Sequence, residues 1–199
     1  MTEHNRGNTE RRIMDAALGI IEEQGFEALG INAIADHAKL SKVLIYRYFD
    51  SIEGLITRII EEQDYWINID VEDDAEGDLM EQIKSIFHKQ AKMLCDNPII
   101  RKFYLWELES NNKITQQLRT ERENGSAKII GYYAERLGIE KDKIEVLGVL
   151  LTNALVYTAI QIDNSPKAYL DLETEQSWKR ITDCIDSLLD MWISQQRKK

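Results

Sequence analysis

INAIADHAKLSKVLIYRYF, residues 31–49, contains two short helical patterns with a tight connection between them. In the first pattern, apolar residues follow the three- and four-residue spacing of an amphipathic helix, at Ile31, Ile34, Ala35 and Ala38. Ser41 then offers an N-cap for a second helix that runs to Phe49. The stretch therefore predicts two short helices that meet at a tight corner.

The second of these helices carries side chains suited to contacts with DNA. Positive charge and hydroxyl groups on rigid rings come from Lys42, Tyr46, Arg47 and Tyr48. Such groups hold phosphates, and a helix-turn-helix places its second helix in the major groove. We expect Ile45 and Phe49 in the core instead, because a recognition helix must bury one face against its own domain.

Helical spacing continues on both sides of this stretch. An amphipathic pattern begins at Thr9 and stops at Gly25, a residue type that readily takes positive φ after a helix. Later helical patterns run from residue 51 toward 66, from 79 to 94, from 98 to 108, from 114 to 137, from 147 to 162 and across 178–192. Because the chain shows no strand pattern, the predicted fold class is all-α.

The N-terminal part of the chain resembles the DNA-binding domain of TetR-family transcriptional regulators. The motifs that carry the resemblance are Ile13–Ala17, Gly25–Phe26, Ile34–Ala35 with Ala38, Leu40–Lys42, Ile45–Phe49, Ser51 and Glu53–Leu55, within residues 9–56. It implies an N-terminal three-helix helix-turn-helix DNA-binding domain and a larger helical ligand-binding and dimerisation domain. It also implies DNA contacts, from Ser41, Lys42, Val43, Leu44, Tyr46, Arg47 and Tyr48.

Several positions on the expected DNA side depart from the family pattern. Gly30 stands where a Ser or Thr cap is usual, Lys39 replaces a turn glycine, and Ile52 stands where a lysine is frequent. Val43 and Leu44 replace a Gly-Thr pair. Leu44 can still contact a thymine methyl group, and Arg47 can reach guanine. The alternative is a TetR-like helical dimer that has lost DNA binding and acts through protein partners.

Composition bounds the class of protein and its compartment. The 199 residues are 43% hydrophobic and 30% charged, with 10 Gly and 2 Pro, which is typical of a helix-rich globular protein. The net charge is −10: residues 1–60 hold 7 basic and 9 acidic residues (−2), and residues 61–199 hold 18 and 26 (−8). With two distant cysteines, Cys95 and Cys184, no long apolar run and no secretory pattern, we expect a cytoplasmic protein without a membrane span.

The domain organisation follows from these patterns. We expect a flexible tail over residues 1–8, the DNA-binding domain over 9–56 and a helical effector-binding and dimerisation domain over 57–199. Residues 146–162 are too apolar for one short neighbour to cover, which favours a two-fold homodimer. The residues expected at the dimer interface are Leu147, Leu151, Leu155, Trp178, Ile181, Ile185, Leu188 and Trp192.

The middle helices are rich in aromatic residues, which suits a pocket for an apolar or aromatic small molecule. The expected ligand-binding residues are Trp66, Phe87, His88, Gln90, Phe103, Trp106 and Asn153. The effector itself is unknown. The three histidines are scattered, and the sequence has neither a phosphate-binding glycine motif nor clustered nucleophiles. We therefore expect no enzyme, no cofactor and no metal, and double-stranded operator DNA as the main partner.

Overall fold

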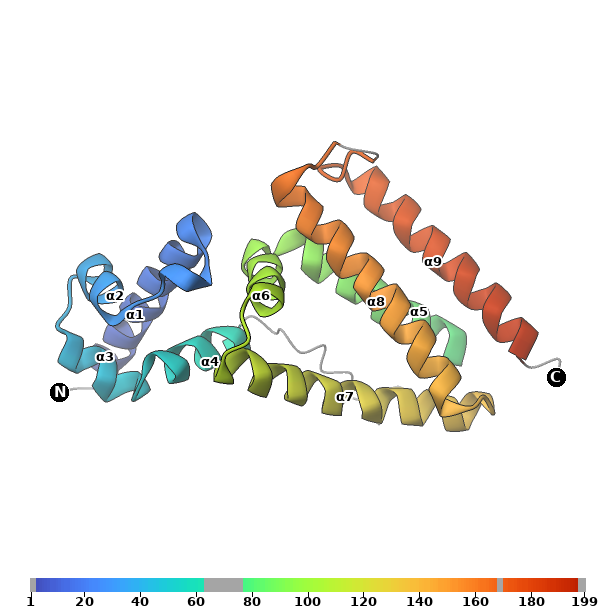
Figure 1. Ribbon diagram of the computed structural model, residues 1–199, viewed down its shortest axis with the longest axis horizontal. Helices are drawn as coiled ribbons and strands as arrows, with labels where there is room; N and C mark the ends of the chain where they lie inside the picture. Colours follow the sequence, from blue (N-terminus) through green and yellow to red (C-terminus); the bar gives the residue numbers. More distant parts are fainter. Residues whose placement is uncertain (1–2, 63–76, 168–169, 197–199) are drawn as a thin grey trace. The chain divides into compact units, whose positions relative to one another are not determined.

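The computed structural model describes residues 3–62, 77–167 and 170–196. Within these ranges the regular structure is helical and no strand is present, which confirms the predicted all-α fold (Figure 1). The helices are α1 (Glu3–Gln24), α2 (Ile31–Ala38), α3 (Lys42–Phe49), α4 (Ile52–Glu62), α5 (Leu79–Asp96), α6 (Pro98–Glu109), α7 (Lys113–Leu137), α8 (Lys141–Asn164) and α9 (Glu175–Gln196), with a 3₁₀ turn η1 (Phe26–Ala28).

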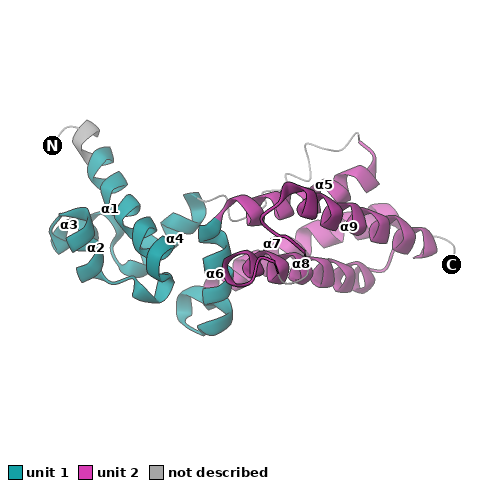
Figure 2. Ribbon diagram, turned by 90° about the horizontal axis from the view of Figure 1, so that it is seen from above, with its two compact units in different colours: residues 1–66, 98–116 teal, residues 67–97, 117–199 magenta. Residues whose placement is uncertain are grey.

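The chain divides into two compact units (Figure 2). Unit 1 contains residues 1–66 and 98–116, and unit 2 contains residues 67–97 and 117–199. The helix-turn-helix therefore shares its unit with α4 and with α6, which comes much later in the sequence. The domain boundary at residues 56–57 stays a prediction.

Unit 1 is built around α1, which packs against α2, α4, α6 and η1. The fully buried side chains on its first four helices include Ile13, Ile20, Ile34, Ile45 and Leu55. Aromatic rings add a second cluster, in which Phe26 stacks on Trp106 with centroids 5.0 Å apart and meets Phe103 edge-on at 5.7 Å. The indole N–H of Trp106 also donates a 2.8 Å hydrogen bond to Glu27. These contacts join α6 to the 3₁₀ turn η1 that follows α1.

The turn between α2 and α3 is held by backbone and side-chain hydrogen bonds. Lys39 takes the left-handed conformation (φ 53°, ψ 47°), the position at which a glycine is usual. The Leu40 N–H donates to the Ala35 carbonyl at 3.0 Å, which closes α2 with a Schellman-type bond. Arg12 of α1 donates to the Ala38 carbonyl at 2.8 Å. This basic side chain therefore stabilises the turn.

The corner between α3 and α4 depends on a glycine. A Cβ at Gly54 would lie 2.2 Å from the Phe49 carbonyl oxygen, closer than real contacts allow. The Gly54 N–H also donates to the Ser51 hydroxyl at 3.0 Å, so Ser51 caps α4. The pKa of Glu53 is lowered, mainly by a backbone hydrogen bond at Glu53 itself and then by Ser51.

In unit 2, α5 is the shared support against which both α8 and α9 pack. An ion pair and a histidine–carboxylate hydrogen bond join α5 and α9. Lys84 lies 3.0 Å from Asp190, and the hydrogen bond between them raises the pKa of Lys84. His88 lies 3.0 Å from Asp186. Gly138 follows the end of α7 with φ 67°.

The helix α8 has more apolar surface than its neighbours cover. Among the described residues, it is the single helix long and apolar enough to cross a membrane, and 28% of its most apolar 18-residue window is buried. Length and composition alone are weak grounds for a membrane span, because a helix of a soluble protein passes the same test. The exposed apolar residues of α8 are Val146, Val149, Leu150 and Tyr157.

The close approach at Gly54 predicts a large effect of a small substitution. Gly54→Ala should lower the free energy of unfolding by roughly 1–3 kcal/mol, because the new methyl group forces the α3–α4 corner apart. Urea denaturation measures this change. Gly19→Ala is the matched control: Gly19 lies within α1 with open space at its Cβ, and the substitution should raise stability by about 0.5–1 kcal/mol. Equal stability of Gly54→Ala and the wild type would contradict the close approach.

Candidate functional site

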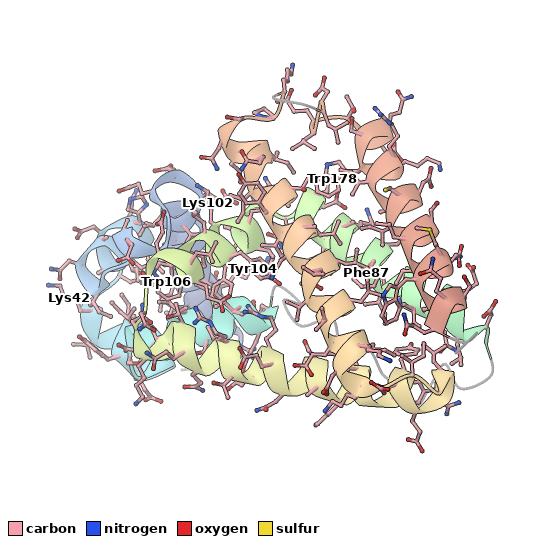
Figure 3. The ribbon with its side chains drawn as sticks, turned by 45° about the vertical axis from the view of Figure 1, so that its right-hand side comes forward. Lys42, Phe87, Lys102, Tyr104, Trp106 and Trp178 are labelled. Atoms are coloured by element: carbon pink, nitrogen blue, oxygen red, sulfur yellow. The ribbon has the colours of Figure 1, made fainter. Side chains whose placement is uncertain are left out.

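The helix α3 has one buried face and one exposed face. Ile45 and Phe49 are buried, which confirms their predicted core positions. The exposed residues at and after the N-cap are Ser41, Lys42, Val43, Tyr46 and Arg47, while Leu44 and Tyr48 are half-buried. Because the buried face is fixed by packing in unit 1, the exposed face presents the predicted DNA-contacting residues as one set. Figure 3 shows Lys42 on the outside of unit 1.

The apolar side chain most available for a base contact is Val43. Its side chain is 72% exposed, on the first turn of α3, whereas Leu44 is half-buried. An exposed branched methyl pair suits the thymine 5-methyl group, and Tyr46, 51% exposed one turn further on, can place its hydroxyl near phosphates. The thymine contact predicted for Leu44 from the sequence stays a prediction.

Basic side chains near α3 fall into two groups. Arg12 is bound to the Ala38 carbonyl, and Arg11 lies 3.6 Å from Asp15, so both have partners within unit 1. Lys39 and Lys42 are exposed on either side of Ser41. The Arg47 guanidinium lies 5.5 Å from the Tyr48 ring centroid, a distance at which a cation and an aromatic face attract each other. Charge for phosphate contacts is therefore concentrated at the turn and on α3.

Neither N-cap residue of the two short helices makes a side-chain hydrogen bond to its helix. Gly30 is the N-cap of α2 and makes no side-chain capping bond. Ser41 is the N-cap of α3, in an extended conformation, and its hydroxyl makes no capping bond either. Both helices therefore rely on packing for their stability.

The predicted ligand-binding residues are divided between the two units. Phe87 and Gln90 are buried on α5 in unit 2, and Gln90 accepts a 3.4 Å hydrogen bond from Thr152 of α8. Phe103 and Trp106 are core residues of unit 1, beside Phe26. Figure 3 labels Trp106 and Phe87 in these separate parts of the chain.

Three further members of the predicted ligand set lie elsewhere. His88 is exposed and paired with Asp186, and Asn153 is exposed on α8. Trp66 lies outside the described residues. The assignment of a ligand site to this set therefore stays a prediction, with Phe87 and Gln90 as its buried members in unit 2.

The predicted dimer residues are mostly turned toward the core of their own unit. Leu151, Leu155, Trp178 and Ile185 are buried, and Leu147, Ile181 and Trp192 are half-buried. Leu188 is 40% exposed and forms a stripe on α9 with Met191 and Cys184. The larger exposed apolar surface lies beside the predicted residues, on the α8 face formed by Val146, Val149, Leu150 and Tyr157.

No group of three or more His, Cys, Asp or Glu side chains within the described ranges is placed to hold a metal ion. One polar group that sequence reasoning missed is the hydroxyl of Tyr132 on α7, which is buried without a hydrogen-bond partner. Its sequence context is that of any core tyrosine, so no sequence signal marks it.

The segment that contains the helix-turn-helix matches a known protein family. Residues 13–59 match the sequence profile of the tetR family of bacterial regulatory proteins. This range runs from the middle of α1 to α4 and includes all of α2 and α3. No curated protein matches the chain.

Solved structures of transcriptional regulators have the same fold over most of the chain. FadR from Bacillus subtilis, solved in complex with stearoyl-CoA, is 21% identical with a TM-score of 0.66, over 90% of this chain and 96% of that one. FadR from Bacillus halodurans, a fatty acid degradation regulator, is 18% identical with a TM-score of 0.66, over 89% and 94%. A TetR-like regulator from Rhodococcus sp. RHA1 is 18% identical with a TM-score of 0.66, over 94% and 96%.

Proposed function

We propose, from the premise that this chain belongs to the tetR family of bacterial regulatory proteins, that it is a homodimeric repressor released from its operator by a small, largely apolar effector. The DNA-binding part of the proposal rests on α3. This helix lies within the matched domain, and one of its faces exposes Lys42, Val43, Tyr46 and Arg47. A helix-turn-helix uses this face to enter the major groove.

The dimer supplies the geometry that two half-sites require. A two-fold pair sets its recognition helices roughly 34–36 Å apart, one turn of the duplex. We assign the interface to the exposed apolar face of α8, together with Leu188 and Met191 of α9. A self-complementary patch of this kind is typical of a two-fold contact, and a second copy of the chain would cover surface that is otherwise in water.

The effector is assigned to unit 2, with long-chain acyl compounds as its first candidates. The support is the likeness to FadR from Bacillus subtilis, solved in complex with stearoyl-CoA, together with the aromatic and apolar content of the unit. The dimer has one geometry that fits the operator and another that does not. An effector releases DNA when its affinity for the second geometry exceeds its affinity for the first. Equal affinity for both geometries would leave repression unchanged.

Substitutions on α3 test the DNA-binding part of the proposal. Tyr46→Ala and Arg47→Ala should each weaken binding to the operator by roughly tenfold or more, through loss of phosphate or base contacts. The measurement is binding of the purified protein to its own upstream DNA, titrated against salt beside a scrambled duplex. Arg180→Ala, an exposed arginine of α9, is the control and should bind as the wild type does.

Two outcomes of that titration would count against the proposal. Unchanged operator binding by both α3 variants would show that this face does not contact DNA. If the wild-type dimer binds no DNA specifically at low salt, with or without acyl ligands, the alternative of a TetR-like dimer that acts through protein partners is favoured. Val43, exposed where the family pattern has a small residue, would then belong to a protein contact.

Charge placed in the α8 face tests the dimer. Leu150→Glu should convert the dimer to a monomer in light scattering after size exclusion, because a carboxylate at a buried interface lacks a partner. Leu108→Glu is the matched control, since Leu108 is a comparably exposed leucine (74%, against 63% for Leu150) on α6 of unit 1. A Leu150→Glu protein that stays dimeric, or a wild type that is monomeric, would refute this interface.

A further inference from the structure

Adjacent tyrosines on α7 have opposite hydrogen-bonding states. The Tyr133 hydroxyl donates to Gln82 of α5 at 3.4 Å, which joins the two helices. The Tyr132 hydroxyl is buried and has no hydrogen-bond partner, and no other buried side-chain nitrogen or oxygen in the described ranges is in this state. Both hydroxyls have the same chemistry and lie in the same unit, so the difference arises from their surroundings.

An unpartnered buried hydroxyl is unfavourable for folding. The group loses its bonds to water and gains none in return, so a phenylalanine of the same shape would be more stable at such a position. A tyrosine there is explained if its hydroxyl meets a group that the folded chain does not itself supply.

The ring of Tyr132 is held in place by its neighbours on the helix. The Arg136 guanidinium carbon lies 4.3 Å from the Tyr132 ring centroid, a close cation–π contact one turn along α7. The Tyr133 ring packs edge-on against the Tyr132 ring, with centroids 5.1 Å apart and planes at 90°. The hydroxyl is therefore pre-oriented, and it can donate a bond at little further cost in side-chain entropy.

The charge over the Tyr132 ring limits which groups its hydroxyl can bind favourably. Arg136 carries a fixed positive charge above the ring, in the last turn of α7. This charge favours an oxygen acceptor, neutral or anionic, and disfavours an ammonium group. A carboxylate or a thioester carbonyl at the end of an apolar chain fits both conditions.

We propose that the Tyr132 hydroxyl is a ligand-binding group of unit 2, which donates a hydrogen bond to a carboxylate or carbonyl oxygen of the effector. The proposal rests on the proposed function, because it places the effector in unit 2. It adds a named contact and an acceptor class to that function. The rest of the effector lies against apolar side chains, as small-molecule sites generally provide.

The experiment compares Tyr132→Phe with its matched control, Tyr133→Phe, in the full-length protein. Without ligand, Tyr132→Phe should leave the thermal midpoint unchanged or raise it by roughly 2–4 °C, whereas Tyr133→Phe should lower it by roughly as much. With stearate and stearoyl-CoA as probes, Tyr132→Phe should weaken binding about tenfold in calorimetry. Stearylamine, which carries an ammonium group, should bind more weakly than stearate.

Each other result overturns the proposal. If Tyr132→Phe lowers the midpoint as Tyr133→Phe does, the hydroxyl already has a partner in the ligand-free protein. If Tyr132→Phe binds the acyl probes as tightly as the wild type, or the wild type binds none of them, Tyr132 is not a contact for this ligand class. Operator binding measured on the same samples distinguishes this failure from failure of the proposed function. If the wild type binds both its operator and the acyl probes, and Tyr132→Phe binds the probes equally tightly, the Tyr132 contact alone is refuted.

Discussion

The helices α2 and α3 have eight residues each and are too short to be stable alone in water. They exist because each buries one apolar face in unit 1, through Ile34, Ala35 and Ala38 on α2 and through Ile45 and Phe49 on α3. This constraint decides which side chains of α3 reach solvent. The packing of unit 1 therefore also determines how the predicted DNA-contacting residues are exposed.

The same constraint explains which parts of the fold are predictable from the sequence. Apolar spacing predicts helices and their buried faces, and Gly25 and Gly138 end helices where positive φ is required. The core positions of Ile45 and Phe49 follow from this spacing as well. Each of these features depends on residues close together in the chain.

Features that depend on distant residues are not predictable in this way. Phe103 and Trp106 have the composition expected of a ligand pocket, yet they pack on Phe26, some 80 residues earlier, because α6 joins unit 1. His88 faces Asp186 for a similar reason. Apolar residues lie on almost every side of α8 between residues 147 and 162, so the sequence does not separate Leu151, which is buried, from Leu150, which is exposed.

If the exposed face of α8 is the dimer contact proposed above, the stability of unit 2 depends on the concentration of the protein. Whatever covers Val146, Leu150 and Tyr157 binds the folded helix and not the unfolded chain, so it stabilises the fold by mass action. Dilution then acts as a mild denaturant, and the folded fraction rises with the number of copies in the cell. A regulator built in this way loses active molecules faster than in proportion as its synthesis falls.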